Sequence, residues 1–380
     1  MDFTLNQEQQ MLQQTAARLV RDTYGYEQRE TFRESAQGFS AQLWQQLGEL
    51  GLAAVPFAEA FGGFGGSGVD LMLIMKELGR NLCLEPYLHS VVFAGGLVEQ
   101  LGNASQKAVL LPQVASTTLQ LAVAVDEPQS HYLLNDVEVT AIPEEGGWKL
   151  QGRKSVVVGG QSAGLILVSA RTSGEARDTD GISLFLVDPN CEGVSRREYH
   201  SIDGRKACEL LLDDVHVTAA ELLGEPGKAL AALRYQQGRA IAAQCAEAVG
   251  SMEAACELTL DYLKTRKQFG VAIGSFQALQ HRMVEMRMEL DQASAMAILA
   301  ACVADEPDSD ERSRALAAAK VVTCRAGRFI ADNAIQLHGG IGLTWEYVLS
   351  HHAKHLLMVA RQFGDDDHHL ESFSRLMQVA

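Results

Sequence analysis

The residues best suited to bind a charged ligand gather in one short stretch, residues 262–281, between two long helical patterns. This stretch carries a guanidinium, two amides and an aromatic ring, at Arg266, Gln268, Gln277 and Phe269. A guanidinium forms paired hydrogen bonds with phosphate oxygens, amides bond polar edges, and an aromatic face stacks on a flat base. The cluster therefore predicts a dinucleotide site. For Arg266 taken alone, a solvated charge at a helix end is the other interpretation.

The elements on either side of this stretch must hold it in place. Upstream, apolar residues recur at steps of three to four, the period of a helix buried along one side. These residues are Cys245, Val249, Met252, Cys256, Leu260 and Leu263. Gly270 is placed to end this helix, Gly274 to form a turn, and Ser275 to cap the helix that follows. We expect a helix–loop–helix whose basic corner presents Arg266.

Two further groups are candidates for chemistry. Gly339 and Gly340 follow a predicted helix, where a glycine pair either caps the helix or lets a ligand approach the backbone. Histidines gather near the C-terminal end, at His351, His352, His355, His368 and His369. The i,i+4 spacing of His351 and His355 suits a metal on one helix face, but the H-E-x-x-H pattern is absent. We expect solvated or stacked helix residues here and no metal.

Length and charge limit the classes of function. A chain of 380 residues is long enough for two or three domains. Its net charge of −16 argues against nucleic acid or an anionic membrane as a partner. Seven cysteines, an odd number without C-x-x-C spacing, indicate reduced thiols. The stretch that begins at Met1 lacks the basic and apolar parts of a signal peptide, and no apolar run reaches membrane length, so we expect a cytoplasmic protein.

The residue pattern changes twice along the chain. Residues 1–118 have helical periodicity, 119–218 are short β-rich runs divided by turn signals, and 228–380 are helical again. The last region divides into four long segments, 229–268, 275–303, 310–338 and 344–375. The glycine-rich segment 61–68 lacks the lysine of a phosphate-binding loop, so we expect a structural loop. The expected fold class is α+β, with a helical domain, a small antiparallel barrel or sandwich, and a helical bundle.

Two ordered motifs resemble those of the acyl-CoA dehydrogenase family. The first is Tyr-x-x-x-Arg-x-Gln-Phe-Gly from Tyr262, followed by Ile-Gly-x-Phe-Gln. The second is Gln-Leu-His-Gly-Gly-Ile-Gly from Gln336, followed by Glu346 and Tyr347. The resemblance runs in order over nearly the whole chain. It implies the family's N-terminal helical domain, central antiparallel β-barrel and C-terminal four-helix bundle, and a tetramer that holds FAD between subunits.

The same resemblance implies which residues contact FAD. They are Val125, Asp126, Val156, Val158, Arg266, Gln268, Phe269, Gln277, Gln336, Leu337, His338, Gly339 and Gly340. Two stretches depart from the family pattern. The Gly-Ala-Gly-Ser turn that usually follows the first flavin-contacting strand reads Gln-Ser-His-Tyr at 129–132. Where the family places Trp and a Thr or Ser, this chain has Val156 and Val158, and Val158 can offer the flavin only its backbone.

The catalytic base departs from the family as well. The family's chemistry needs a carboxylate that removes the α-proton of the acyl-CoA. Matching the family's segments puts Phe363 at the usual position of this carboxylate and Ala240 at the less common one. Glu247 shares the face of Ala240, about 10 Å further along the helix. It is the candidate for a displaced base, and a satisfied structural carboxylate is its other interpretation. The aspartates at 365–367 are expected to be solvated.

The resemblance implies an FAD-dependent oxidoreductase that dehydrogenates an acyl-CoA thioester and passes electrons to an electron-transferring flavoprotein. The chain also resembles the small subunits of bacterial heteromeric members, which act on dicarboxylyl (pimeloyl-CoA), steroid- or terpenoid-derived thioesters. This second likeness leaves an alternative, a non-catalytic FAD-binding or structural subunit whose sister subunit supplies the base. A homo- or hetero-tetramer is therefore expected. A flavin oxidase that uses oxygen is a third hypothesis.

Overall fold

The computed structural model describes residues 4–378. Part of the segment in which the sequence analysis looked for a signal peptide therefore lies outside the described residues. Helices fill the N-terminal and C-terminal regions, and a sheet lies between them in the sequence. This arrangement confirms the expected α+β class. The chain divides into two compact units, which we describe one at a time. The helical unit comprises Met1–Glu30, Ser67–Cys83 and Ile241–Ala380, and the sheet unit comprises Thr31–Gly66 and Leu84–Ala240. Among the described residues, no helix has the length and apolarity needed to cross a membrane.

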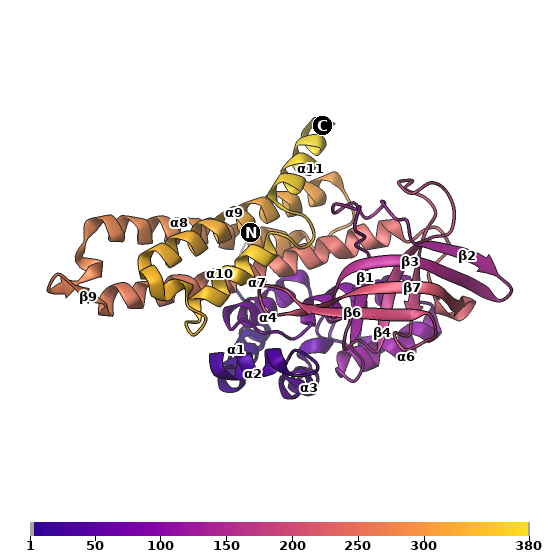
Figure 1. Cartoon of the computed structure of the whole chain (residues 1–380), viewed down its shortest axis with the longest axis horizontal. Coiled ribbons are helices and arrows are strands. Elements are labelled where there is room, and N and C mark those ends of the chain that lie inside the picture. The colour runs from indigo at the N-terminus through magenta and orange to yellow at the C-terminus, as the bar shows by residue number, and fades with distance from the viewer. Residues whose placement is uncertain (1–3, 379–380) are drawn as a thin grey trace. The chain divides into compact units, whose positions relative to one another are not determined.

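The helical unit is a bundle of long helices with a short hairpin at one end (Figure 1). Its helices are α1 (Gln7–Thr23), α4 (Gly68–Arg80), the main part of α7 (Leu230–Thr265), α8 (Gln277–Val303), α9 (Asp310–His338), α10 (Leu349–Val359) and α11 (Asp366–Gln378). A hairpin of β9 (Lys267–Gln268) and β10 (Val271–Ala272) joins α7 to α8, and a short 3₁₀ turn follows it. α2 (Tyr26–Glu34) begins in this unit. Small apolar side chains from α7, α8 and α9 form its core.

The predicted helical stripe on α7 is confirmed in large part. Five of its six members are buried in the core of the bundle, and Leu260 is exposed.

The helices α4 and α7 approach each other through two glycines. A Cβ at Gly79 would lie 1.9 Å from the main-chain oxygen of Glu247, and one at Gly250 would lie 1.9 Å from that of Lys76. Only glycine allows backbones to pack at this distance.

The sheet unit packs short helices against an eight-stranded sheet. The helices are α3 (Ala41–Glu49), a π-helix (Tyr87–Gly95), α5 (Gly96–Leu101) and α6 (Ala104–Ala115). The strands are β1 (Leu121–Ala124), β2 (Thr140–Glu144), β3 (Gly147–Val158), β4 (Leu165–Arg171), β5 (Ile182–Val187), β6 (Val194–His200), β7 (Lys206–Thr218) and β8 (Leu222–Leu223). The order is β6-β7-β3-β2-β4-β5-β8, with β1 beside β4.

The sheet differs from the sequence expectation in detail. Most pairings are antiparallel, but β1 and β2 each pair with β4 in parallel. The strand β3 is long for a region in which the sequence predicted only short β-rich runs, since it continues from Gly147 to Val158. The edge strand β6 was not predicted, because its sequence, Val-Ser-Arg-Arg-Glu-Tyr-His, is polar and has no fully buried residue. An edge strand with charged side chains discourages pairing with another sheet.

The predicted helix 344–375 is wrong, because two shorter helices, α10 and α11, occupy this region. The buried side chain of Lys320 on α9 explains the break. Its Nζ donates to the main-chain oxygens of Val359, at 2.6 Å, and Gln362, at 2.9 Å, and also to Oε1 of Gln244. A lysine that bonds the last carbonyls of a helix caps it. Burial lowers the pKa of Lys320.

We predict that Lys320→Met will destabilise the protein strongly. The substitution keeps the length of the side chain but leaves three buried acceptors without their donor, which should lower the free energy of unfolding by about 3 kcal/mol or more. Urea unfolding followed by circular dichroism measures this loss. Lys264→Met, at an exposed position on α7, is the matched control. Equal stability of the two variants would contradict the capping role.

Candidate functional site

A tight hairpin turn presents Phe269 to solvent. Val271 pairs with Gln268, so Phe269 and Gly270 form the two-residue turn, with φ of 53° and 84°. Two positive φ values are characteristic of a type I′ turn, the usual tight hairpin connection. The side chain of Phe269 is 90% exposed, and its ring meets the edge of Phe276 with centroids 6.2 Å apart. Gln268 is exposed as well.

The polar side chains expected beside this ring are also exposed. Arg266 follows the last residue of α7, and Gln277 is the first residue of α8. The prediction that Ser275 caps α8 is wrong. Ser275 belongs to the 3₁₀ turn between the hairpin and α8, and its hydroxyl donates to the main-chain oxygen of Ala272 at 2.7 Å. The described N-cap is Phe276, without a side-chain hydrogen bond.

The second motif lies at the same end of the bundle. The ring of His338, at the end of α9, stacks on Tyr262 with centroids 4.4 Å apart, one turn before Arg266. His338 Nδ1 lies 2.8 Å from the main-chain oxygen of Ala334, and Nε2 lies 3.2 Å from the hydroxyl of Tyr347. A carbonyl only accepts, so we assign the proton to Nδ1 and the acceptor role to Nε2. Burial lowers the pKa of His338, which favours the neutral ring.

The glycines after His338 leave their backbone open. Gly339 and Gly340 are exposed, and a Cβ added to either would meet nothing within 4 Å. Gln336 is exposed too, whereas the side chain of Leu337 belongs to the core. Leu337 therefore has only its backbone to offer a ligand.

These features fit the FAD that the resemblance implies. An exposed guanidinium at Arg266 suits a pyrophosphate, an exposed ring at Phe269 suits stacking, and open backbone at Gly339 suits close approach. Their contacts with FAD stay predictions.

In the sheet unit, the other predicted contacts lie on two adjacent segments. Val125 and Asp126 follow β1; Val125 is buried and Asp126 is exposed. The main-chain N–H of Ser155 donates to the oxygen of Asp126 at 2.8 Å, so this segment lies beside the end of β3. The register of β3 against β7 shifts between Lys154 and Val157, which is a bulge. Bulges re-aim side chains and are common beside active sites.

Val156 lies within this bulge in an unusual backbone conformation. Its φ is 52°, a region that β-branched residues rarely adopt, and its side chain is 45% exposed. Such strain persists only where the surrounding structure enforces it. Val158, at the end of β3, is half-buried. The strand end thus presents a strained backbone at one of the predicted flavin positions.

Glu247 lies inside the helical unit. It is 1% exposed, and its Oε1 lies 3.9 Å from Nε2 of His355 on α10. It stands 19 residues before Arg266 on α7, or roughly 28 Å along the helix axis. The structure therefore does not bring Glu247 together with the hairpin residues. It does bring Glu247 near the segment after α10, since Gln244, one turn earlier, bonds Gln362 at 2.8 Å.

The residues that the resemblance matches to the family's two base positions carry no acid. Phe363 is half-buried against the core of the bundle and has a φ of 57°. Its main-chain oxygen lies 2.7 Å from Nε2 of His369. Ala240 is fully buried in the sheet unit. Of the aspartates expected to be solvated, Asp365 is half-buried and accepts from the N–H of His368 at 2.9 Å, at the start of α11.

The histidines of α10 are buried, so of the two expected environments, solvated or stacked, the solvated one does not apply, and His351 makes the expected ring contact. His351 packs against Trp345, with ring centroids 4.7 Å apart, and His352 Nδ1 lies 2.9 Å from the hydroxyl of Ser251. Burial lowers the pKa of His352 to about 3. Within residues 4–378, no group of three or more His, Cys, Asp or Glu side chains is arranged to hold a metal ion.

A buried acid near the sheet was missed by the sequence analysis. Glu85 is 4% exposed and accepts from the N–H of Ser40 at 3.0 Å, while its Oε2 has no hydrogen-bond partner among the described residues. The next residue, Pro86, lies against Gly159, where an added Cβ would come within 3.4 Å. Burial raises the pKa of Glu85 to about 7. A single glutamate before a proline gives no sequence signal of this environment.

We predict that Glu85 makes the protein less stable as pH rises. Its pKa is about 7 when folded and 4.5 ordinarily, so the unfolded chain loses the proton first. Protonated Glu85 contributes roughly 3 kcal/mol to the free energy of unfolding. This contribution is complete below pH 4.5 and is lost as the pH rises through 7. Glu85→Gln should flatten the pH dependence of urea unfolding in this window, whereas Glu145→Gln, in an exposed turn, should not. Parallel pH curves for the wild type and Glu85→Gln would refute the assignment.

Comparison with known proteins places the chain in a family. Sequence profiles of the acyl-CoA dehydrogenase N-terminal, middle and C-terminal domains match residues 6–118, 122–215 and 227–377. A solved variant of the Tcur3481-Tcur3483 steroid ACAD covers 99% of both chains with a TM-score of 0.88 and 29% identity.

Two relatives match by sequence along most of their length. The mitochondrial long-chain specific acyl-CoA dehydrogenase of Sus scrofa is 31% identical, over 83% of this chain and 74% of its own. The probable acyl-CoA dehydrogenase YngJ of Bacillus subtilis is 30% identical, over 91% of this chain and 92% of its own. The chain therefore belongs to the acyl-CoA dehydrogenase family and is an FAD-dependent flavoprotein oxidoreductase.

Proposed function

We propose that this protein dehydrogenates an acyl-CoA thioester between its α- and β-carbons and passes the electrons to an electron-transferring flavoprotein. The observation that carries the proposal is the exposed end of the helical unit, where Arg266, Phe269 and the open backbone of Gly339 lie. The relatives are in accord, because the Bacillus subtilis protein is described as a probable acyl-CoA dehydrogenase and the solved neighbour as a steroid ACAD. A fatty-acyl or a steroid-derived thioester is the proposed substrate class.

Each set of residues has a separate task in this proposal. Arg266 pairs with the pyrophosphate of the cofactor, and Phe269 stacks on a flat part of it. The segments ending in Asp126 and Val158 offer backbone groups to the flavin, and Val158 does so through its N–H or carbonyl because it has no hydroxyl. Bound FAD supplies the acceptor for the hydride that leaves the β-carbon. A carboxylate must take the α-proton.

Arg266→Ala should weaken FAD binding by about ten- to a hundredfold, because a charge-assisted pair contributes roughly 1.5–3 kcal/mol. The circular dichroism of the helices should not change. Titration of the apoprotein with FAD, followed by the quenching of flavin fluorescence, gives the dissociation constants. Arg18→Ala, on the exposed side of α1, is the control. If Arg266→Ala binds FAD as tightly as the wild type, the assigned role of Arg266 is wrong. A separate experiment tests the reaction: addition of acyl-CoA should bleach the yellow wild-type protein.

We also propose that the working protein is a cytoplasmic tetramer, composed of this chain alone or of this chain and a sister subunit. The exposed apolar side chains of Phe269, Val271 and Phe276 support it, since apolar side chains gathered on a surface mark an interaction site. A sister subunit would also account for the base. Phe363 and Ala240 occupy the family's positions, and Glu247 is buried against His355.

The lone chain should therefore turn over straight-chain acyl-CoA poorly. General-base catalysis typically contributes about 10²–10⁴-fold, so its absence will be plain even when FAD and ligand bind. Exchange of the α-proton and reduction of a dye are measured for the wild type, Glu247→Gln and Phe363→Glu. We expect little activity in the first two, a gain in Phe363→Glu, and rescue of the wild type by a co-expressed homologue that carries the acid.

One result would reverse this assignment. Robust activity of the lone wild type that disappears in Glu247→Gln would make Glu247 the base and remove the need for a sister subunit. Because Glu247 is buried, thermal unfolding of Glu247→Gln must accompany the assay. If Glu247→Gln unfolds at the same temperature as the wild type, its loss of activity results from the missing acid and not from loss of the fold.

A further inference from the structure

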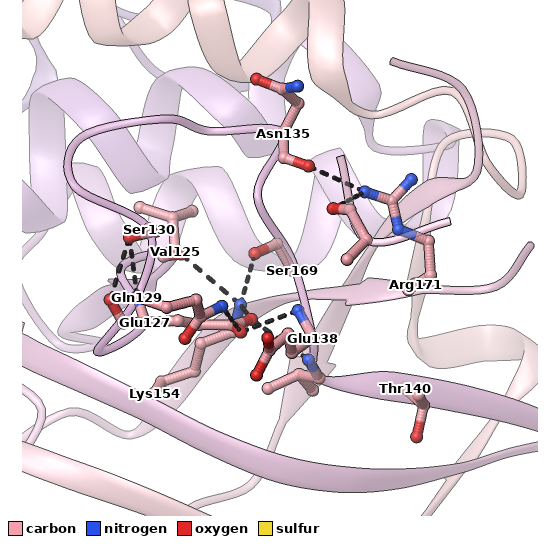
Figure 2. A network of polar contacts seen from close by, with 12 residues as sticks. Val125, Glu127, Gln129, Ser130, Asn135, Glu138, Thr140, Lys154, Ser169 and Arg171 are labelled. Carbon is pink, nitrogen blue, oxygen red and sulfur yellow. Dashed lines mark hydrogen bonds and ion pairs between the residues drawn. The ribbon is translucent and has the colours of Figure 1, made fainter. Parts of the chain in front are cut away.

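A fully buried ion pair in the sheet unit lies beside the two segments predicted to contact the flavin. Lys154 on β3 is 0% exposed, and its Nζ lies 2.6 Å from Oε1 of Glu127, whose side chain is 2% exposed. The same Nζ donates to the hydroxyl of Ser169 on β4 at 2.8 Å. Figure 2 shows the amine of Lys154 between these groups and the main chain of Val125. Burial lowers the pKa of Lys154, and the charge of Glu127 opposes that shift.

Glu127 also organises the turn that departs from the family pattern. Its Oε2 accepts from the main-chain N–H of Glu138 and from the amide of Gln129, both at 2.8 Å. Its own N–H donates to the hydroxyl of Ser130 at 3.1 Å, and that hydroxyl donates back to the oxygen of Glu127. The turn that lacks the family's glycines is thus tied to Glu127, through its carboxylate at Gln129 and through its main chain at Ser130 (Figure 2).

The pair connects the two segments predicted to contact the flavin. Lys154 is the last residue before the bulge that contains the strained Val156. Glu127 directly follows Asp126, whose main-chain oxygen accepts from the N–H of Ser155. The Nζ of Lys154 also lies 3.5 Å from the oxygen of Val125. A shift of either charged side chain would therefore move the backbone of both segments.

Buried ion pairs are poor stabilisers, because desolvation of two charges offsets their attraction. Their best-attested use is to specify one arrangement of the chain. In this unit, the arrangement that Lys154 and Glu127 specify is that of Val125–Asp126 relative to Val156–Val158. A role in positioning explains why two charges are buried here better than a role in stability does.

We propose that Lys154 and Glu127 form a positioning pair that sets the backbone of residues 125–126 and 156–158 in the geometry that receives the flavin. The proposal rests on the proposed function, since it assumes that these segments contact FAD. Neither residue touches the cofactor in this proposal. They act through the carbonyl of Asp126 and through the bulge at Val156.

The test compares two double variants of the full chain. Lys154→Met/Glu127→Gln removes both charges at similar volume, and Lys149→Met/Asp214→Asn removes an ion pair of 3.2 Å from the other end of β3, where the side chains reach solvent. FAD affinity of each apoprotein, the visible circular dichroism of bound flavin, and urea unfolding are measured. We expect the first double variant to bind FAD at least tenfold more weakly with an altered flavin spectrum. The control should match the wild type.

The outcomes separate the two claims. Wild-type protein that binds no FAD rejects the proposed function itself. Wild-type FAD affinity and spectrum in a folded Lys154→Met/Glu127→Gln variant reject only the positioning role. If that variant does not fold, Ser169→Ala decides, because it keeps both charges and removes one hydrogen bond from Lys154. A two- to tenfold loss of FAD affinity in Ser169→Ala supports the proposal, and an unchanged affinity overturns it.

Discussion

A lysine that is buried must be given acceptors for all three of its N–H groups, because it has lost the water that solvated them. This chain meets the requirement twice. Lys154 donates to a carboxylate, a hydroxyl and a carbonyl, and Lys320 donates to an amide oxygen and two carbonyls. In each unit, one ammonium group bonds acceptors both on regular elements and in a neighbouring turn, such as Ser169 on β4 with Glu127, and Gln244 on α7 with Gln362. The two ammonium groups therefore decide where the turn after β1 and the turn after α10 lie.

The parts of this structure that follow a local rule could be predicted from the sequence. The period of the apolar residues predicted the buried side of α7. Gly270, in contrast, was expected to end α7, but α7 ends at Thr265 and Gly270 lies in the turn of the hairpin with a φ of 84°. The motifs around Arg266 and Gln336 predicted the family, and the profiles and relatives bear this out.

The parts that depend on distant partners could not be predicted. Lys320 finds its acceptors on α7, at the end of α10 and after α10, so nothing near it in the sequence marks it as buried. A lysine in an amphipathic pattern is normally assigned to the surface, and the break between α10 and α11 was missed for this reason. Glu85 is a similar case, because its environment comes from Ser40 and from the charge of Arg205, both far from it in the sequence. Which of the predicted residues contact FAD stays a prediction.

The position of Glu247 follows from the same close packing that fixes α7. Its main-chain oxygen lies against Gly79 of α4, so α7 cannot rotate about its axis at this point without a backbone clash. Its side chain meanwhile faces His355 within the bundle. Burial and backbone packing together fix Glu247 as part of the bundle, which favours the structural carboxylate among its two interpretations. A base supplied by a sister subunit stays a proposal.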